Sequence, residues 1–202
     1  MGDTEDRRVL RTKKRIRDTF AELIEEKGLD RVTVKDLTEQ ADINRGTFYL
    51  HFHDKYDLLE QSEAEILNGI KQIAKELDDV DMNNWKKENG PHPAAEKYFT
   101  YLKEHALFVR AVLGPKGDPG FQRKMKTLIA DGIKKKFAGK ERKSQPFPAD
   151  YLIAYLVSAH LGVVQHWIEN GLQESPEEMA KIISSMNYDG PLVASGLKKD
   201  SS

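Results

Sequence analysis

Apolar residues recur every three or four positions along most of the chain, which is the spacing of one face of an α-helix. The first such stripe is formed by Ile16, Phe20, Leu23 and Ile24. Because glycine adopts positive φ at little cost, we expect this first helix to end at Gly28. The chain contains no alternating apolar and polar run long enough for a useful strand. The sequence therefore predicts an all-α fold.

Two short helices are expected directly after the first. Thr33 and Asp36 have the spacing of a capping-box variant, so a second helix begins there. Asn44 is a good N-cap for a third helix that runs from Arg45 to about Phe52. A turn of only a few residues separates these two helices. The arrangement is that of a helix-turn-helix, in which the second helix enters the DNA major groove while the first steadies it.

A long fourth helix is expected from Lys55 to beyond Leu77, followed by a loop rich in Asn, Gly and Pro. Further helices are predicted near Ala94 to Leu113, Pro119 to Ala138, Ala149 to Gly171 and Pro176 to Met186. The predicted organisation is an N-terminal helix-turn-helix domain at 8–54 with its motif at about 33–52, a connecting helix at 55–82, a C-terminal helical domain at 94–188 and a frayed tail at 189–202.

The segment from Tyr151 to Ile168 carries no formal charge over its eighteen residues, close to the length that crosses a bilayer. Polar residues interrupt it, among them His160 and Gln165. The small residues Ala159 and Gly162 suit close packing between helices. We therefore expect a core helix of a soluble protein.

The 202 residues include 32 Lys and Arg against 33 Asp and Glu, so overall charge indicates neither nucleic acid nor membrane as a partner. The first helix nevertheless contains a basic run without any acidic residue, which suits DNA phosphates or simply a solvated helix face. It comprises Arg7, Arg8, Arg11, Lys13, Lys14, Arg15 and Arg17. The absence of cysteine excludes disulfides and thiolate chemistry. The first residues lack the apolar segment of a secretory signal, so we expect a cytoplasmic protein.

Residues from about Arg11 to Leu59 closely resemble the N-terminal DNA-binding domain of TetR-type (TetR/AcrR) transcriptional regulators. The matching positions are Ile16, Phe20, Gly28, Thr33-Val34, Leu37, Ala41, Ile43 to Tyr49, His51-Phe52, Lys55 and Leu58-Leu59. The resemblance implies a homodimer that reads a palindromic operator in double-stranded DNA. It also implies a C-terminal helical bundle that dimerises and binds a ligand that releases DNA. Asp42 and Asn44 stand where Gly and Ser are commoner in the family, which leaves the base preference open.

The resemblance also assigns DNA-binding residues. Arg45, Gly46, Thr47, Tyr49 and His51 occupy recognition-helix positions, and Thr33 and Lys55 occupy positions that resemble the family's phosphate contacts. Phe48 and Phe52 are expected in the core, and Tyr49 has packing as its alternative role. The pair His51 and His53 has the spacing of half a metal site but no third ligand at a helical spacing, so we expect no metal and no cofactor.

The second half offers apolar helices for both a pocket and a dimer seam, and the pattern alone does not divide the residues between them. Aromatic residues and others that suit the wall of a small-molecule cavity, or equally a plain core, are Tyr98, Tyr101, Leu102, Phe108, Leu128, His160 and Trp167. Small or amphipathic residues that suit a dimer seam are Tyr155, Ser158, Gly162 and His166. No charged cluster accompanies the aromatic group, which predicts a mainly apolar ligand.

Enzyme motifs are absent from the sequence. The glycine-rich stretch from Gly114 to Gly120 follows a helix rather than a strand and lacks a Gly-Lys-Ser or Gly-Lys-Thr ending. We therefore expect no enzyme, but a sequence-specific transcriptional regulator, a dimeric repressor released from a palindromic operator by a mainly apolar small molecule. The alternative is a TetR-like regulator whose C-terminal domain binds a protein partner. A third interpretation, a helical small-molecule carrier or enzyme, leaves the basic N-terminus without a function.

Overall fold

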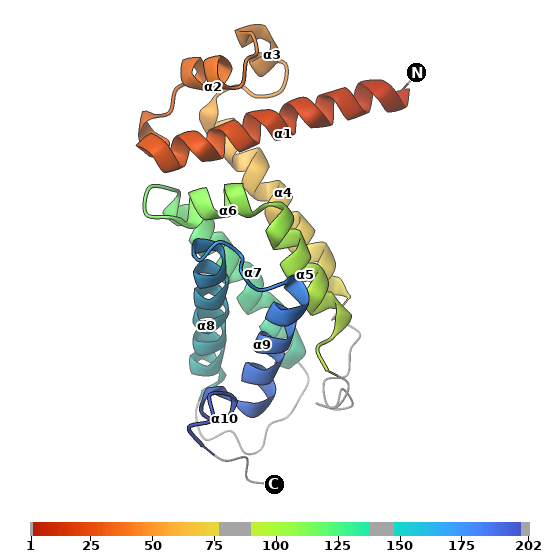
Figure 1. The fold of residues 1–202 in the computed structure, drawn as a ribbon, viewed down its shortest axis with the longest axis vertical. Helices are drawn as coiled ribbons and strands as arrows, with labels where there is room; N and C mark the ends of the chain where they lie inside the picture. The colour runs from red at the N-terminus through yellow and green to blue at the C-terminus, as the bar shows by residue number, and fades with distance from the viewer. Residues whose placement is uncertain (1, 77–89, 138–147, 199–202) are drawn as a thin grey trace. The chain divides into compact units, whose positions relative to one another are not determined.

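The computed structural model describes residues 2–76, 90–137 and 148–198 of the chain. This part consists of helices without any strand, which confirms the all-α prediction (Figure 1). The elements are α1 (Gly2–Lys27), the 3-10 helix η1 (Leu29–Arg31), α2 (Val34–Gln40), α3 (Arg45–Tyr49), α4 (Lys55–Lys75), α5 (Pro93–Glu104), α6 (Ala106–Leu113), α7 (Pro119–Phe137), α8 (Ala149–Glu169), α9 (Pro176–Asp189) and α10 (Pro191–Ala194). The end of the predicted connecting helix, 77–82, lies outside the described residues.

The chain forms two compact units. The first comprises Met1–Asn68 and His105–Met125, and the second comprises Gly69–Glu104 and Lys126–Ser202. Both units are therefore assembled from segments that are far apart in the sequence. In particular, α6 and the start of α7 belong to the same unit as the predicted helix-turn-helix.

Helix α1 ends where the sequence predicts. Gly28 has a φ of 85°, a value that side chains other than glycine rarely adopt. The last carbonyl groups of α1 receive hydrogen bonds from the Lys116 ammonium, at 2.9 Å to Glu25 O and 3.0 Å to Glu26 O. The backbone N–H of Leu29 donates to the carbonyl of Lys116 at 3.1 Å. The end of α1 is thus satisfied by a loop about ninety residues further along the chain.

The caps of α2 and α3 also follow the prediction. Thr33 and Asp36 form a capping box, and the Asn44 side chain accepts the backbone N–H of Thr47. Helix α3 is shorter than predicted, because it ends at Tyr49 rather than near Phe52. Its last turn tightens where the N–H of His51 donates to the carbonyl of Phe48, three residues back.

The predicted single helix from Ala94 to Leu113 is wrong, because the chain breaks at His105 into α5 and α6. The break coincides with the boundary between the two units. Apolar residues of α6, including Phe108 and Val112, are buried in the first unit, where α6 packs against α1. Those of α5 are buried in the second unit, where α5 packs against α9. Burial in two different cores, rather than local sequence preference, separates the helices.

The first unit has its core under the helix-turn-helix. The side chains of Ile16, Phe20, Ile24, Leu37 and Phe48 are fully buried there. Helix α2 packs against α1, and α3 packs against α2 (Figure 1). The predicted core positions of Phe48 and Phe52 are confirmed.

The second unit buries one face of α8. Ile153, Val157, Val164 and Trp167 of this helix are buried, whereas Tyr151 on the opposite face is 73% exposed. Among the described helices, α8 alone is long and apolar enough to span a membrane. The short helix α10 lies in the predicted tail and contacts α9.

Candidate nucleic-acid interface

Helix α3 presents polar and aromatic side chains to solvent from a firmly anchored backbone. Phe48 is fully buried and fixes the helix, and its ring meets the edge of the Tyr49 ring at 5.5 Å. Arg45 and Gly46 are exposed, Thr47 is half-buried, and Tyr49 is 54% exposed. Apart from Tyr49 and the C-cap residue Leu50, which is 80% exposed, α3 presents no bulky apolar group to solvent, which suits contact with a nucleic acid.

The N-cap of α3 fixes the position of Thr47. The Asn44 Oδ1 accepts the backbone N–H of Thr47 at 2.7 Å and its hydroxyl at 3.0 Å. A Cβ atom added at Gly46 would lie 3.2 Å from the same Oδ1. Glycine at position 46 thus leaves the cap undisturbed and lets the backbone approach a neighbouring surface.

Thr33 lies exposed at the start of α2. Its hydroxyl and its backbone N–H both donate to the Asp36 carboxylate, at 2.7 Å and 2.8 Å. The Lys27 ammonium also contacts this carboxylate at 2.6 Å. These hydrogen bonds, with that from Lys27 the strongest, lower the pKa of Asp36 to about 2.

Lys55 is the first residue of α4, and its side chain points toward η1. Its ammonium donates to the carbonyl oxygens of Leu29 and Asp30, at 3.0 Å and 2.7 Å. It also lies 5.0 Å from the centre of the Tyr56 ring. Two of its three N–H groups are thus occupied by η1, and one remains for another acceptor.

His51 is half-buried beside the Phe52 ring, at 6.2 Å between ring centres. Burial lowers its pKa, and the charge of Lys13 lowers it further. The imidazole is therefore neutral at pH 7 and contributes a hydrogen-bonding group rather than a charge. Within the described part of the chain no group of three or more His, Asp or Glu residues has the arrangement of a metal site.

The basic run of α1 divides into two kinds of residue. Arg17 is buried and pairs with Glu65 of α4 at 2.8 Å, so it belongs to the packing of the unit. Lys13 lies 5.8 Å from the centre of the Phe52 ring. Arg8 and Arg11 are exposed and remain on the outer side of the helix. The sequence itself indicates that Arg17 is buried, because at helical spacing it lies beside the buried residues Ile16 and Ala21. The interpretation of the basic run as one face did not take this position into account.

The residues expected to line a pocket lie in both units. Tyr98, Leu102, His160 and Trp167 belong to the second unit, with the Tyr98 and His160 rings 6.2 Å apart. Phe108 belongs to the first unit, where its ring lies 6.5 Å from that of Phe121. Leu128, half-buried on α7, and Tyr101 lie in the second unit.

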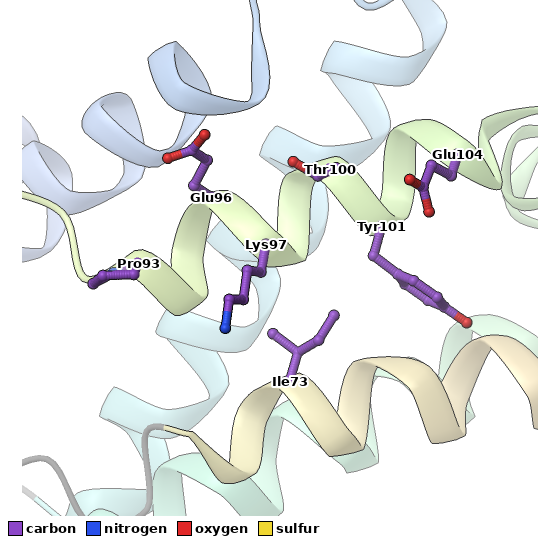
Figure 2. Close-up of a pocket in the computed structure, with 7 residues that line it drawn as sticks. All are labelled: Ile73, Pro93, Glu96, Lys97, Thr100, Tyr101 and Glu104. Atoms are coloured by element: carbon purple, nitrogen blue, oxygen red, sulfur yellow. The ribbon is translucent and has the colours of Figure 1, made fainter.

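A groove of about 430 Å³ lies between α5 and the end of α4 in the second unit. Figure 2 shows Lys97 and Tyr101 directed toward α4 and Glu96 directed away from it. Lys97 is held by Glu76 at 2.7 Å. A Cβ atom added at Gly69 would lie 2.2 Å from the end of the Tyr101 ring, so glycine is what lets this ring rest on α4.

The residues expected at a dimer seam share the outward face of α8. Ser158, Gly162 and His166 are exposed there, and Tyr155 is 51% exposed. Apart from its chain neighbours and the backbone of its own helix, no atom of the described residues lies within 4 Å of a Cβ added at Gly162. Small residues along an exposed helix face permit close approach of a second helix.

Two family models match the chain. The model described as "Bacterial regulatory proteins, tetR family" matches residues 16–61. The model described as "Transcriptional regulator C-terminal region" matches residues 89–189, which is half of the chain. The chain belongs to the TetR family of transcriptional regulators. TetR-family proteins bind DNA and form dimers, and they are regulators rather than enzymes.

Related proteins agree with this assignment. An HTH-type transcriptional regulator of Bacillus subtilis, YxbF, is 20% identical over 170 residues, and the match spans 82% of this chain and 42% of YxbF. A TetR regulator from Streptococcus agalactiae has the same fold, with a TM-score of 0.56 at 18% identity, over 92% of this chain and 98% of that one. The dihydroxyacetone kinase operon activator DhaS gives a TM-score of 0.52 at 20% identity, over 87% and 93% of the two chains.

The sequence analysis identified the helix-turn-helix but did not predict an ion pair between a buried carboxylate and a half-exposed lysine in the same unit. Glu63 of α4 is 1% exposed and accepts from the Lys124 ammonium at 2.6 Å. Burial raises the pKa of Glu63, and Lys124 opposes that rise. The available signal was an acidic residue between Leu59 and Ile66 on the apolar face of a helix.

Proposed function

We propose that this TetR-family regulator is a dimeric repressor that binds a palindromic operator through α3 of each protomer. In this proposal a mainly apolar small molecule binds the second unit and releases the DNA. The observation that best supports this proposal is that Arg45 and Tyr49 of α3 are exposed while Phe48 of the same helix is anchored in the core. The DNA target places its action in the cytoplasm.

The proposed DNA contacts fall into two classes. Arg45, Thr47, Tyr49 and His51 face the bases of the major groove, with Gly46 allowing close approach. Thr33 and Lys55 contact phosphates on either side, Lys55 through the N–H that η1 leaves unused. Exposed Arg8 and Arg11 add sequence-independent attraction to the DNA backbone.

The proposed dimer forms along the exposed face of α8. Tyr155, Ser158, Gly162 and His166 of one protomer pack against the same residues of the other, because a two-fold interface uses the same surface twice. The open space around Gly162 supports close helix contact. Dimerisation holds two α3 helices at a fixed spacing, which a palindrome matches.

The proposed effector site lies within the second unit and is formed by Tyr98, Tyr101, Leu102, Leu128, His160 and Trp167. Phe108 is not part of it, since it packs in the first unit. Aromatic walls with few polar groups suit an apolar molecule. The ligand shifts the population of conformers away from the one that fits DNA.

The experiment that tests this function is a titration of duplex DNA with the full chain at several salt concentrations. The proposal predicts that log affinity falls linearly with log salt, as counterions leave the phosphates. It also predicts that one palindromic sequence binds at least about a thousandfold more tightly than random duplex. Binding without sequence preference, or no binding, contradicts it.

A second candidate function keeps the DNA binding and gives the second unit a protein partner. The observation that favours it is a group of exposed apolar side chains on α9, α10 and the residues after them, namely Met186, Tyr188, Leu192 and Leu197. A rise in melting temperature with small apolar molecules, without any protein partner, rejects this candidate.

A further inference from the structure

The second unit encloses a polar atom that no described residue satisfies. The hydroxyl oxygen of Tyr98, on α5, is buried and has no hydrogen-bond partner among the described residues. A buried hydroxyl without a partner is costly and rare in folded proteins. Burial also raises the pKa of Tyr98, so the hydroxyl keeps its proton at any physiological pH.

A second polar group lies beside it. His160 of α8 has its ring 6.2 Å from that of Tyr98, and no hydrogen bond to its imidazole is present in the described part of the chain. Burial lowers the pKa of His160, so the ring is neutral at pH 7. Both groups can donate and accept a hydrogen bond. Each side chain as a whole is half-buried, whereas the Tyr98 hydroxyl itself is enclosed.

Tyr98 and His160 form an aromatic cluster with Phe99 and Trp167. The remaining polar group of this cluster already has a hydrogen-bond partner. The indole N–H of Trp167 donates to the carbonyl of Glu174 at 3.0 Å. Phe99 connects the cluster, with its ring 5.1 Å from Tyr98 and 5.4 Å from Trp167. Tyr98 and His160 are therefore the two groups of the cluster that remain available to a ligand.

The surroundings also decide the charge of that ligand. The residues one helical turn from Tyr98 on α5 are Ala94, Ala95, Tyr101 and Leu102. Those one turn from His160 on α8 are Leu156, Val157, Val163 and Val164. None of these neighbours on the two helices carries a charge, so a ligand carboxylate or ammonium would find no counterion among them.

We infer that Tyr98 and His160 form the polar anchor of the effector site, and that the effector is an uncharged, mainly apolar molecule with one hydroxyl or carbonyl oxygen. This inference rests on the proposed function and specifies its ligand class. The ligand oxygen bonds to the Tyr98 hydroxyl and the His160 imidazole, while its apolar part packs against the aromatic cluster.

The test compares three probes with the same apolar body, namely 4-butylphenol, butylbenzene and 4-butylbenzoate, by calorimetric titration of the full chain. The inference predicts that the phenol binds about tenfold more tightly than butylbenzene, and the benzoate more weakly than the phenol. Tyr98→Phe abolishes the difference between phenol and butylbenzene. His160→Leu weakens phenol binding about tenfold and His160→Gln restores part of it. Tyr151→Phe, which removes an exposed hydroxyl of α8, changes nothing.

A second readout needs no ligand. Because the Tyr98 hydroxyl is unsatisfied, Tyr98→Phe leaves the melting temperature of the free protein unchanged or raises it. A fall in melting temperature shows that the hydroxyl has a structural partner and overturns the inference. Equal binding of the three probes, or no binding of any of them, also overturns it. DNA binding by the same preparations is measured separately. Absence of DNA binding rejects the proposed function, whereas DNA binding without the predicted order of probe affinities rejects only the proposed ligand class.

Discussion

Arg45 and Lys55 represent the two kinds of DNA contact that we propose, and their different surroundings allow the two kinds to be tested separately. Arg45 is exposed on α3, whereas the Lys55 ammonium is held between two carbonyl groups of η1. Base contacts set the sequence preference, and phosphate contacts strengthen binding to every sequence.

We expect Arg45→Ala to reduce binding to the preferred operator by about 1–3 kcal/mol and to leave binding to random duplex nearly unchanged. Lys55→Met should weaken binding to all sequences alike and reduce the salt slope by about one. Anisotropy titrations against operator and random duplex measure both effects, with Lys181→Met on α9 as the control. If both variants lose affinity equally on every sequence, the division into base and phosphate contacts is wrong.

Asp36 makes the stability of the fold depend on pH in a predictable direction. Its pKa falls from 3.8 to about 2 through hydrogen bonds from Lys27 and Thr33. A carboxyl whose folded pKa is lowered stabilises the fold above the unfolded pKa, and this contribution is lost as the pH falls through the folded value.

Asp36→Asn should therefore lower the free energy of unfolding at pH 6 by about 1 kcal/mol, the usual worth of a helix cap. The difference from the natural chain should shrink as the pH falls from 4 toward 2. Urea unfolding followed by circular dichroism gives this comparison, with Asp131→Asn as the exposed control. A difference that is constant with pH would show that the carboxylate charge does not act in the cap.

At the scale of elements, local signals predicted the caps but not the break between α5 and α6. Thr33, Asn44 and Gly28 have side chains or backbone preferences that act within a few residues, so their roles follow from the sequence. His105 carries no such signal, being neither glycine nor proline. The break depends on Phe108 and its neighbours being buried against α1, which is a contact distant in sequence. The burial of Arg17, by contrast, follows from its helical position beside Ile16 and Ala21, and only its partner Glu65 is distant in sequence.

Gly117 tests the loop that joins α6 to α7. A Cβ atom added there would lie 2.3 Å from the carbonyl oxygens of Ala111 and Val112, which are backbone atoms and give little room. We expect Gly117→Ala to lower the free energy of unfolding by about 1–3 kcal/mol. Gly132→Ala is the matched control, because outside its own helix no atom of the described residues lies within 4 Å of its Cβ, and alanine should raise helix stability by up to about 1 kcal/mol. If thermal unfolding shows that both variants are more stable than the natural chain, or that both are less stable, this packing is contradicted.

At the scale of the whole molecule, the exposed face of α8 carries the proposal of a dimer. Ser158→Arg places a charge in the middle of the proposed seam, so we expect the dimer dissociation constant to rise at least about a hundredfold. Operator affinity should fall with it, because two α3 helices no longer bind together. Gln173→Arg, on an exposed turn of the same unit, is the charge-matched control. Sedimentation at several protein concentrations measures the result, and an unaltered dimer would place the seam elsewhere.

The DNA-binding half of the molecule could be predicted further than the effector half. The spacing of caps and core residues between Ile16 and Leu59 defines one local arrangement, and its fold follows from near neighbours in the sequence. The proposed effector residues come from α5, α7 and α8, and the distances between them depend on how helices that are far apart in the sequence pack. Sequence patterns therefore selected Tyr98 and His160 as candidates but could not separate them from Phe108, which lies in the other unit.

The central claim is that a dimer of this chain reads a palindrome, and selection from a random duplex library at moderate salt tests it most directly. The account predicts an enriched palindrome whose half-sites are one DNA turn apart, about 34 to 36 Å, or a multiple of it, bound by a particle with twice the mass of the chain. Arg45→Ala should change the selected bases without changing that spacing. A library that emerges without an enriched motif, or with a motif lacking two-fold symmetry, would contradict the account.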